Sequence, residues 1–336
     1  MEQLDTVPKR IRNAAGAFPE YTALLSKDEQ GEFQAITYRE LYRTAQVIGC
    51  GLHTLGVSRG DHVGLIPYTT LFRSFADLGI LGIGAIDVPR GSDSTDEEIK
   101  FILAHADCSV AIAENAKQAD KILKHKKSLP SLERIILFDD SGQVKSKQAD
   151  MVTISSFSDL RQAGEEFLAE NEGFFDSEVD AGSTDEIATL IYTSGTTGDP
   201  KGVMLSHRSF IFQLDRVYEH IYIKAGDVLL SVLPVWHSFE RAVEYVILNC
   251  GAALAYSKPV GSVMLPDMEK VKPQWLASVS RIWEGIKAAI YRKMKKQGGV
   301  KLFMFTLFVG IGEMHAALTN MFTDRLPDFH RRSKIL

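Results

Sequence analysis

Apolar residues recur along this chain with two different periods, and the two periods alternate from one end to the other. Residues 37–56 open with Thr37 and Glu40, the spacing of a capping box, and apolar side chains then return every three or four positions as far as Gly56. Residues 62–66 are instead a short apolar run, typical of a buried strand. Repeated strand–helix–strand order predicts an α/β fold of mainly parallel sheets covered by helices.

The same alternation predicts further elements on both sides of a polar, acidic stretch at residues 141–184, which we interpret as a connector. Strands are expected at residues 109–114, 134–140, 186–192, 227–234, 252–257 and 275–280, and helices at residues 159–169, 208–220, 239–248 and 281–299. The pattern therefore predicts two βαβ-type subdomains. The first covers residues 1–180 with most of the connector, and the second covers residues 181–336.

Composition narrows the class of protein. The 336 residues are 45% hydrophobic and 24% charged, as in ordinary soluble globular proteins. With a net charge of −5 and no dominant basic stripe, nucleic acid is not an expected partner. The cysteines Cys50, Cys108 and Cys250 lie far apart among apolar neighbours, which favours buried structural thiols over a zinc site or disulfides.

The first 18 residues lack the apolar core of a signal peptide. The longest apolar run, residues 302–312, is too short for a bilayer span, which needs about 20 residues. We interpret it as part of a buried helix, with a membrane-surface contact as the alternative. A cytoplasmic protein is expected, with peripheral contact at the inner membrane face left open, as is the oligomeric state.

The stretch LIYTSGTTGDPKGVMLSH, residues 190–207, has the composition of a phosphate-binding loop. Glycines let the backbone approach a ligand closely, and N–H groups, hydroxyls and an ammonium can then contact phosphate oxygens. Because Pro200 precedes the lysine and Gly202 follows it, the stretch is not a Walker A loop. A Ser/Thr/Gly-rich surface turn is the alternative. The candidate phosphate-binding residues are Thr193, Ser194, Gly195, Thr196, Thr197, Gly198, Lys201 and Gly202.

YTSGTTGDPKGV resembles the signature loop of the adenylate-forming superfamily, which includes acyl-CoA synthetases and peptide-synthetase adenylation domains. In that family the loop grips the β- and γ-phosphates of ATP. The resemblance implies that Lys201 supplies charge to the phosphates and that the Thr193 hydroxyl lies near Mg²⁺.

A second stretch, LPVWHSFERAVEYVIL at residues 233–248, resembles a further core motif of this family. That resemblance implies that His237 lines the channel for the acyl carboxylate; the alternative is a helix N-terminal histidine satisfied by the backbone. The HSFER form is similar to that of long-chain fatty acyl-CoA synthetases. Glu240 and Arg241 can form a simple surface ion pair, and the sequence assigns them no functional role.

The resemblance implies a long-chain fatty acid:CoA ligase. The fatty carboxylate attacks the α-phosphate of ATP to give acyl-AMP and pyrophosphate, and the thiol of coenzyme A then displaces AMP. Two anions meet in the first step, so it needs positive charge, oriented N–H donors and Mg²⁺. The alternatives are a fatty acyl-AMP ligase that feeds a carrier protein and a non-catalytic remnant that binds nucleotide or acyl chains.

Two features depart from the family pattern. The chain contains no Tyr-Gly-x-Thr-Glu motif, whose glutamate would complete the Mg²⁺ site, and no C-terminal lid domain with a catalytic lysine. We therefore expect an N-terminal portion that cannot complete acyl activation by itself. In addition, YTTLFRS at residues 68–74 fits badly, and one reverse translation matches the end of a common sequencing adapter. We hypothesise that this segment is not native; an intact long read of native DNA that encodes it would contradict this.

Overall fold

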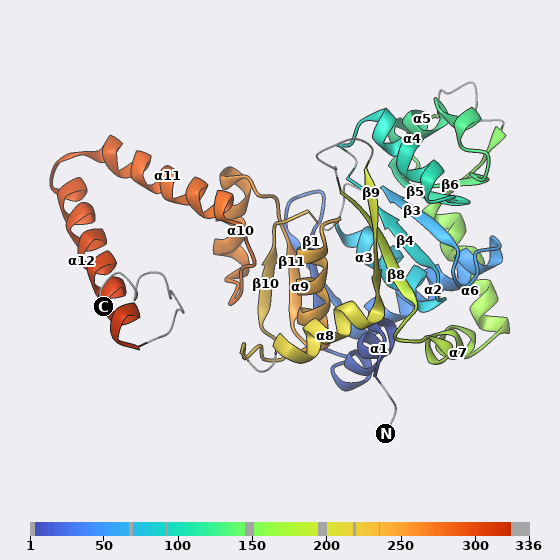
Figure 1. Cartoon of the computed structure of the whole chain (residues 1–336), viewed down its shortest axis with the longest axis horizontal. Helices are drawn as coiled ribbons and strands as arrows, with labels where there is room; N and C mark the ends of the chain where they lie inside the picture. Colours follow the sequence, from blue (N-terminus) through green and yellow to red (C-terminus); the bar gives the residue numbers. More distant parts are fainter. Residues whose placement is uncertain are drawn as a thin grey trace. The chain divides into compact units, whose positions relative to one another are not determined.

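The computed structural model describes residues 4–66, 70–91, 93–144, 151–193, 200–217, 220–234 and 236–323. The chain divides into two compact units, Met1–Ala277 and Ser278–Leu336. Within these described residues, the first unit contains two β-sheets and their helices, and the second contains two helices (Figure 1).

The larger sheet has seven strands in the order β7-β6-β5-β3-β4-β8-β9. Neighbouring strands are parallel except for the antiparallel pair β8–β9. Most of these strands are short buried runs, as the sequence predicted for β3, β5, β6 and β8. The bounds are β3 His62–Ile66, β4 Ile86–Pro89, β5 Val110–Asn115, β6 Arg134–Asp139, β7 Thr153–Ser156, β8 Ile187–Thr193 and β9 Lys201–Ser206.

The smaller sheet has four strands in the order β10-β11-β1-β2. It joins β1 (Thr22–Lys27) and β2 (Phe33–Thr37) to β10 (Val228–Ser231) and β11 (Ala253–Tyr256). Each sheet therefore takes strands from both sides of residue 180, so the predicted boundary at residues 180/181 does not separate the sheets. The alternation of apolar and polar residues in a strand shows which face of the strand is buried. It does not show which other strand pairs with it, because pairing depends on contacts between segments distant in sequence.

Helices cover both sheets of the first unit. α2 packs against α3 and α6, while α9 packs against α1, α8 and β11. The capping box of α2 is formed as the sequence predicted: Thr37 accepts from the Glu40 N–H, and the Glu40 carboxylate accepts from the Thr37 N–H. The helices are α1 Val7–Ala17, α2 Tyr38–Thr54, α3 Thr70–Gly82, α4 Asp96–His105, α5 Ala116–Leu123, α6 Phe157–Glu170, α7 Phe174–Ala181, α8 His207–Val217, α9 Ser238–Asn249 and α10 Gly261–Val271.

The stretch interpreted as a connector is largely structured. β7 extends the larger sheet, and α6 and α7 pack on α2. The strand expected at residues 275–280 is wrong, because Trp275 makes an isolated bridge to Leu229 and the following residues lead into a helix. All three cysteines are buried, as expected for structural thiols.

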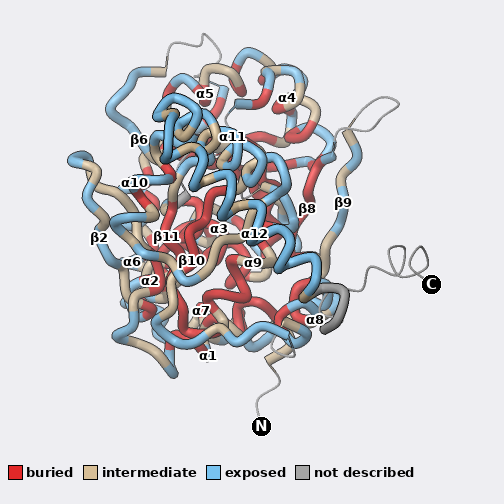
Figure 2. Tube along the Cα trace, turned by 90° about the vertical axis from the view of Figure 1, so that its left-hand side faces the viewer, coloured by how far each residue is buried: buried red, intermediate tan, exposed pale blue. Residues whose placement is uncertain are grey.

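The described part of the second unit is formed by α11 (Ser280–Gln297) and α12 (Gly299–Thr323), which contact each other through Tyr291 and Phe305. The expectation that residues 302–312 are buried is wrong for this structure. Phe303 is 66% exposed and Phe308 60% exposed, and both helices are exposed or half-buried along their described length (Figure 2). Residues 299–319 are long and apolar enough to cross a membrane, judged by length and composition. This window extends the eleven-residue run through Val300 on one side and through Met314, Ala316, Ala317 and Leu318 on the other.

Candidate active site

The two ends of the predicted phosphate loop lie side by side. β8 ends at Thr193 and β9 begins at Lys201, and the antiparallel register pairs these two residues directly. Opposed Cα atoms in such a ladder are about 5 Å apart, so the Thr193 hydroxyl and the exposed Lys201 share one end of the hairpin. Ser194, Gly195, Thr196, Thr197 and Gly198 lie outside the described residues, and their phosphate contacts stay predictions.

Tyr192, on β8, contributes to the packing of this hairpin. It is paired with Gly202, and a Cβ added at Gly202 would lie 3.1 Å from the Tyr192 ring, so this glycine permits close packing. The Tyr192 hydroxyl is 2.8 Å from Nδ1 of His105, whose ring stacks on Phe101. Burial raises the pKa of Tyr192 to about 12, so its phenol stays neutral at physiological pH.

A cavity of about 320 Å³ opens beside the hairpin, at the carboxyl ends of β4 and β8. Ligands of open α/β sheets bind at such strand ends. The structure brings the predicted residues Thr193 and His237 to this one cavity, although they are far apart in sequence. The lining residues are Arg90, Asp93, Ser94, Glu98, Tyr192, Thr193, Trp236 and His237.

Arg90 places a positive charge in the cavity wall, and sequence reasoning missed it. Its Nε donates to the Ser94 hydroxyl at 2.9 Å, and one terminal nitrogen donates to Glu98 at 3.0 Å. The other terminal nitrogen lies 3.4 Å from the Tyr192 carbonyl oxygen, so Arg90 also links β4 to β8. The only signal in the sequence was an arginine directly after a buried strand, which carries no specificity by itself.

His237 is the N-cap residue of α9, as its position in the sequence suggested. Its side chain makes no capping hydrogen bond, and its backbone N–H donates to the Pro234 carbonyl at 3.0 Å. The exposed imidazole therefore faces the cavity instead of satisfying the helix end. Next to it, the Trp236 ring packs so closely on Gly91 that a Cβ there would lie 2.6 Å away.

The surface ion pair considered for Glu240 and Arg241 is wrong, because both side chains are completely buried. Arg241 instead pairs with Asp77 of α3 and Asp87 of β4. Glu240 accepts a hydrogen bond of 2.5 Å from the Ser231 hydroxyl. Burial, followed by the nearby charge of Glu244, raises the pKa of Glu240 to about 8, which favours its neutral form.

The side chains at the cavity bear on where a metal ion could bind. Within the described parts of the chain, no group of three or more His, Cys, Asp or Glu side chains is arranged to hold a metal ion. The cavity nevertheless offers the Thr193 hydroxyl together with the Asp93 carboxylate, and oxygen donors of this kind suit Mg²⁺. The Mg²⁺ contact of Thr193 stays a prediction.

Mainly parallel sheets covered by helices, with a cavity at the strand ends beside the β8–β9 hairpin, define an α/β protein with a candidate ligand site at that edge of the sheet. The chain belongs to the AMP-binding enzyme family, whose model matches residues 11–331. This confirms the resemblance to adenylate-forming enzymes.

Similar proteins support both the family and the fold. A long-chain-fatty-acid–acyl-carrier-protein ligase of Arabidopsis thaliana is 27% identical over 94% of this chain and 44% of its own length. A long-chain-fatty-acid–CoA ligase of Xenopus laevis is 25% identical over 98% of this chain and 45% of its own. The adenylation domain of a Segniliparus rugosus carboxylic acid reductase, solved with AMP and a carboxylic acid, is 19% identical. Its TM-score is 0.71, over 89% of this chain and 52% of that one, and it confirms the predicted fold. The chain spans less than half the length of these two ligases.

Proposed function

We propose that this chain carries the nucleotide- and acyl-binding part of an enzyme that activates a long-chain fatty acid with ATP. The supporting observation is that Thr193 and His237 line one cavity, with Lys201 opposite Thr193 in the hairpin. ATP would place its phosphates on the hairpin side, and the fatty carboxylate would approach from the His237 side. Lys201 and Arg90 then supply positive charge where the two anions meet.

Several groups have separate tasks in this proposal. Lys201 neutralises the β- and γ-phosphates, while Glu98 and Ser94 hold the Arg90 guanidinium in place. Mg²⁺, held near the Thr193 hydroxyl, would offset the remaining phosphate charge. The carboxylate oxygen attacks the α-phosphorus, the bond to the bridging oxygen breaks, and pyrophosphate leaves as acyl-AMP forms.

We propose coenzyme A as the acceptor in the second step, in which its thiol displaces AMP from the acyl group. The relatives carry names of both kinds, CoA ligase and acyl-carrier-protein ligase, so a carrier protein is the alternative acceptor. Acyl transfer from preformed palmitoyl-AMP, measured with coenzyme A and with acyl-carrier protein in parallel, distinguishes them. The assay uses this chain and any longer protein that its gene encodes.

Binding of a non-hydrolysable palmitoyl-adenylate analogue tests the cavity assignment directly. We expect His237→Ala to weaken binding of this analogue by about tenfold, equivalent to about 1.4 kcal/mol. The analogue has no β- or γ-phosphate, so Lys201→Ala is tested with ATP, for which we expect a similar loss of affinity. Lys224→Ala removes an equally exposed lysine outside the cavity and should leave affinity unchanged. An analogue that does not bind, or that binds all variants equally, would overturn the assignment. Fatty-acid-dependent ATP–pyrophosphate exchange then measures turnover, which we expect this chain not to support by itself.

For location, we propose the cytoplasm with peripheral contact at the inner membrane face. The exposed apolar surface of α12 supports this contact.

A further inference from the structure

A buried charged cluster lies directly behind the cavity, and Arg241 is at its centre. One terminal nitrogen of Arg241 is 2.6 Å from the Asp87 carboxylate and 3.1 Å from the Thr189 hydroxyl. The other terminal nitrogen pairs with Asp77, and Nε donates to the Tyr245 hydroxyl at 2.8 Å. Arg241, Asp87 and Thr189 have no solvent exposure at all.

The partners of Arg241 belong to the segments that end in the cavity. Asp87 lies on β4, which leads into Arg90, and Thr189 lies on β8, which ends at Thr193. Arg241 itself lies one turn after His237, and its backbone N–H donates to the His237 carbonyl at 3.3 Å. One guanidinium thus joins three segments that supply the walls of the cavity.

The chemistry of arginine suits this task. A guanidinium has five N–H donors in a fixed plane, so it can bind two carboxylates and two hydroxyls at once. A lysine ammonium on a flexible stem cannot hold the same set of partners in one geometry. Buried ion pairs contribute little net stability compared with apolar packing, but removing one partner leaves uncompensated charge. These contacts therefore suit a group that fixes an arrangement of segments more than one that stabilises the fold.

We propose that Arg241 is a positioning residue that holds the first turn of α9 against β4 and β8, and thereby sets His237 opposite Thr193. This inference rests on the proposed function in one respect, namely that the cavity binds ATP and a fatty carboxylate. The positioning itself can be measured without any ligand.

Trp236 reports on this arrangement, because it is next to His237 and lines the cavity. The chain has three tryptophans, Trp236, Trp275 and Trp283, so labelling with 5-fluorotryptophan gives three ¹⁹F NMR signals that single Trp→Phe variants assign. We expect Arg241→Met to shift the Trp236 signal by more than its linewidth and to leave the Trp283 signal in place. Arg241→Lys should produce a smaller shift in the same direction.

Arg73→Met is the matched control. Arg73 is nearly as buried and pairs with Glu244 at 2.5 Å, one turn further along α9 than Arg241. It also lies 3.9 Å from the Asp77 carboxylate, so it belongs to the same charged cluster but is centred away from His237. Both Met variants should lower the melting temperature, but Arg73→Met should leave the Trp236 signal in place. If Arg241→Met does not fold, Arg241→Lys, which keeps the buried charge, provides the measurement.

The proposal is overturned if the folded Arg241 variants keep the Trp236 signal of the unsubstituted chain. It is also overturned if Arg73→Met shifts this signal equally, since the effect would then be a general loss of packing. Titration with the palmitoyl-adenylate analogue separates the two proposals. If the analogue leaves Trp236 unchanged while Arg241→Met shifts it, the proposed function fails and the positioning role stands.

Discussion

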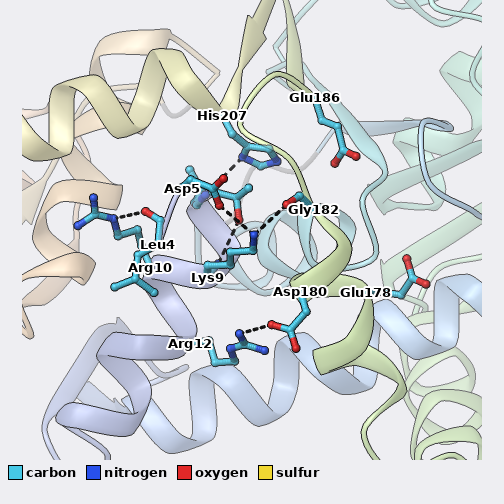
Figure 3. Close-up of polar contacts among 12 residues, drawn as sticks. Leu4, Asp5, Lys9, Arg10, Arg12, Glu178, Asp180, Gly182, Glu186 and His207 are labelled. Atoms are coloured by element: carbon cyan, nitrogen blue, oxygen red, sulfur yellow. Dashed lines mark hydrogen bonds and ion pairs between the residues drawn. The ribbon is translucent and has the colours of Figure 1, made fainter. Parts of the chain in front are cut away.

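His207, at the start of α8, is a buried imidazole packed against the first turn of α1 (Figure 3). The Val7 N–H points at its Nδ1 from 3.4 Å, and Lys9 is held nearby by Asp5 and the Gly182 carbonyl, each at 2.9 Å. Burial lowers the pKa of His207 to about 4, with smaller opposing effects from neighbouring charges. The folded protein therefore keeps this imidazole neutral under mildly acidic conditions.

This burial predicts a loss of stability in acid. Below pH 6.5 the unfolded chain binds a proton at this histidine while the folded chain does not, so stability falls as the pH drops from about 6.5 to 4. Urea unfolding at pH 7 and pH 4.5 should show this loss, on the order of 2 kcal/mol, and His207→Gln should remove it. His220→Gln, at an exposed position, serves as the control. Identical pH dependence in His207→Gln and the unsubstituted chain would contradict the expectation.

Glu240 predicts the opposite dependence on pH. Its folded pKa of about 8 lies above the unfolded value of 4.5, so the stability that the neutral form provides is present at low pH. This stability is lost as the pH rises from about 4.5 through 8. Glu240→Gln keeps a neutral group beside the Ser231 hydroxyl, and its free energy of unfolding should vary less between pH 5 and pH 9. The exposed Glu29→Gln is the control, and an unchanged slope in Glu240→Gln would refute the assignment.

At the scale of single residues, the sequence did not predict which polar side chains are buried or which partners they have. The histidine of HSFER could be assigned by resemblance because its motif is specific. Arg241 could not, because a charged residue near a helix start is usually solvated, and its partners Asp77 and Asp87 lie more than 150 positions away. Only the folded chain shows that these carboxylates converge on one guanidinium.

At the scale of elements, α2 and α6 pack closely because a glycine lies between them. A Cβ built on Gly164 would collide with the backbone carbonyl oxygen of Val47, and backbone cannot move aside as the end of a side chain can. We expect Gly164→Ala to lower the free energy of unfolding by about 2 kcal/mol through overpacking.

Gly16→Ala provides the matched comparison, because Gly16 is also helical and has nothing within 4 Å of an added Cβ. It should leave stability unchanged or raise it by up to about 1 kcal/mol, as expected for an exposed helical position. Chemical denaturation of both variants measures the difference. Equal stability of the two would show that α2 and α6 can separate without cost.

The elements themselves were more predictable than their arrangement. Local signals, such as the capping box at Thr37, gave the start of α2. β9 was not predicted, because most of its side chains are exposed or half-buried and its strand conformation comes from pairing with β8. The mixing of early and late strands in both sheets depends on long-range pairing, which no local pattern contains.

At the scale of the whole molecule, charge and apolar surface gather in the second unit. Residues 280–319 contain seven Lys or Arg residues and two Glu residues, and the apolar side chains of α12 are exposed. A basic segment next to an apolar helix suits an anionic bilayer, since each Lys or Arg near such a surface contributes about 1 kcal/mol. This is the physical basis of the proposed membrane contact.

Vesicle flotation tests that contact. We expect the chain to float with phosphatidylglycerol vesicles and far less with phosphatidylcholine vesicles, and we expect 0.5 M salt to reduce flotation because screening weakens the charge attraction. Phe303→Asp combined with Phe308→Asp should lower the bound fraction at least fivefold, because both side chains are exposed on α12. Phe212→Asp, at a similarly exposed position of the first unit, should have no effect. If the chain does not float, or if the α12 variant floats as well as the Phe212→Asp control, the proposed membrane contact of α12 is wrong.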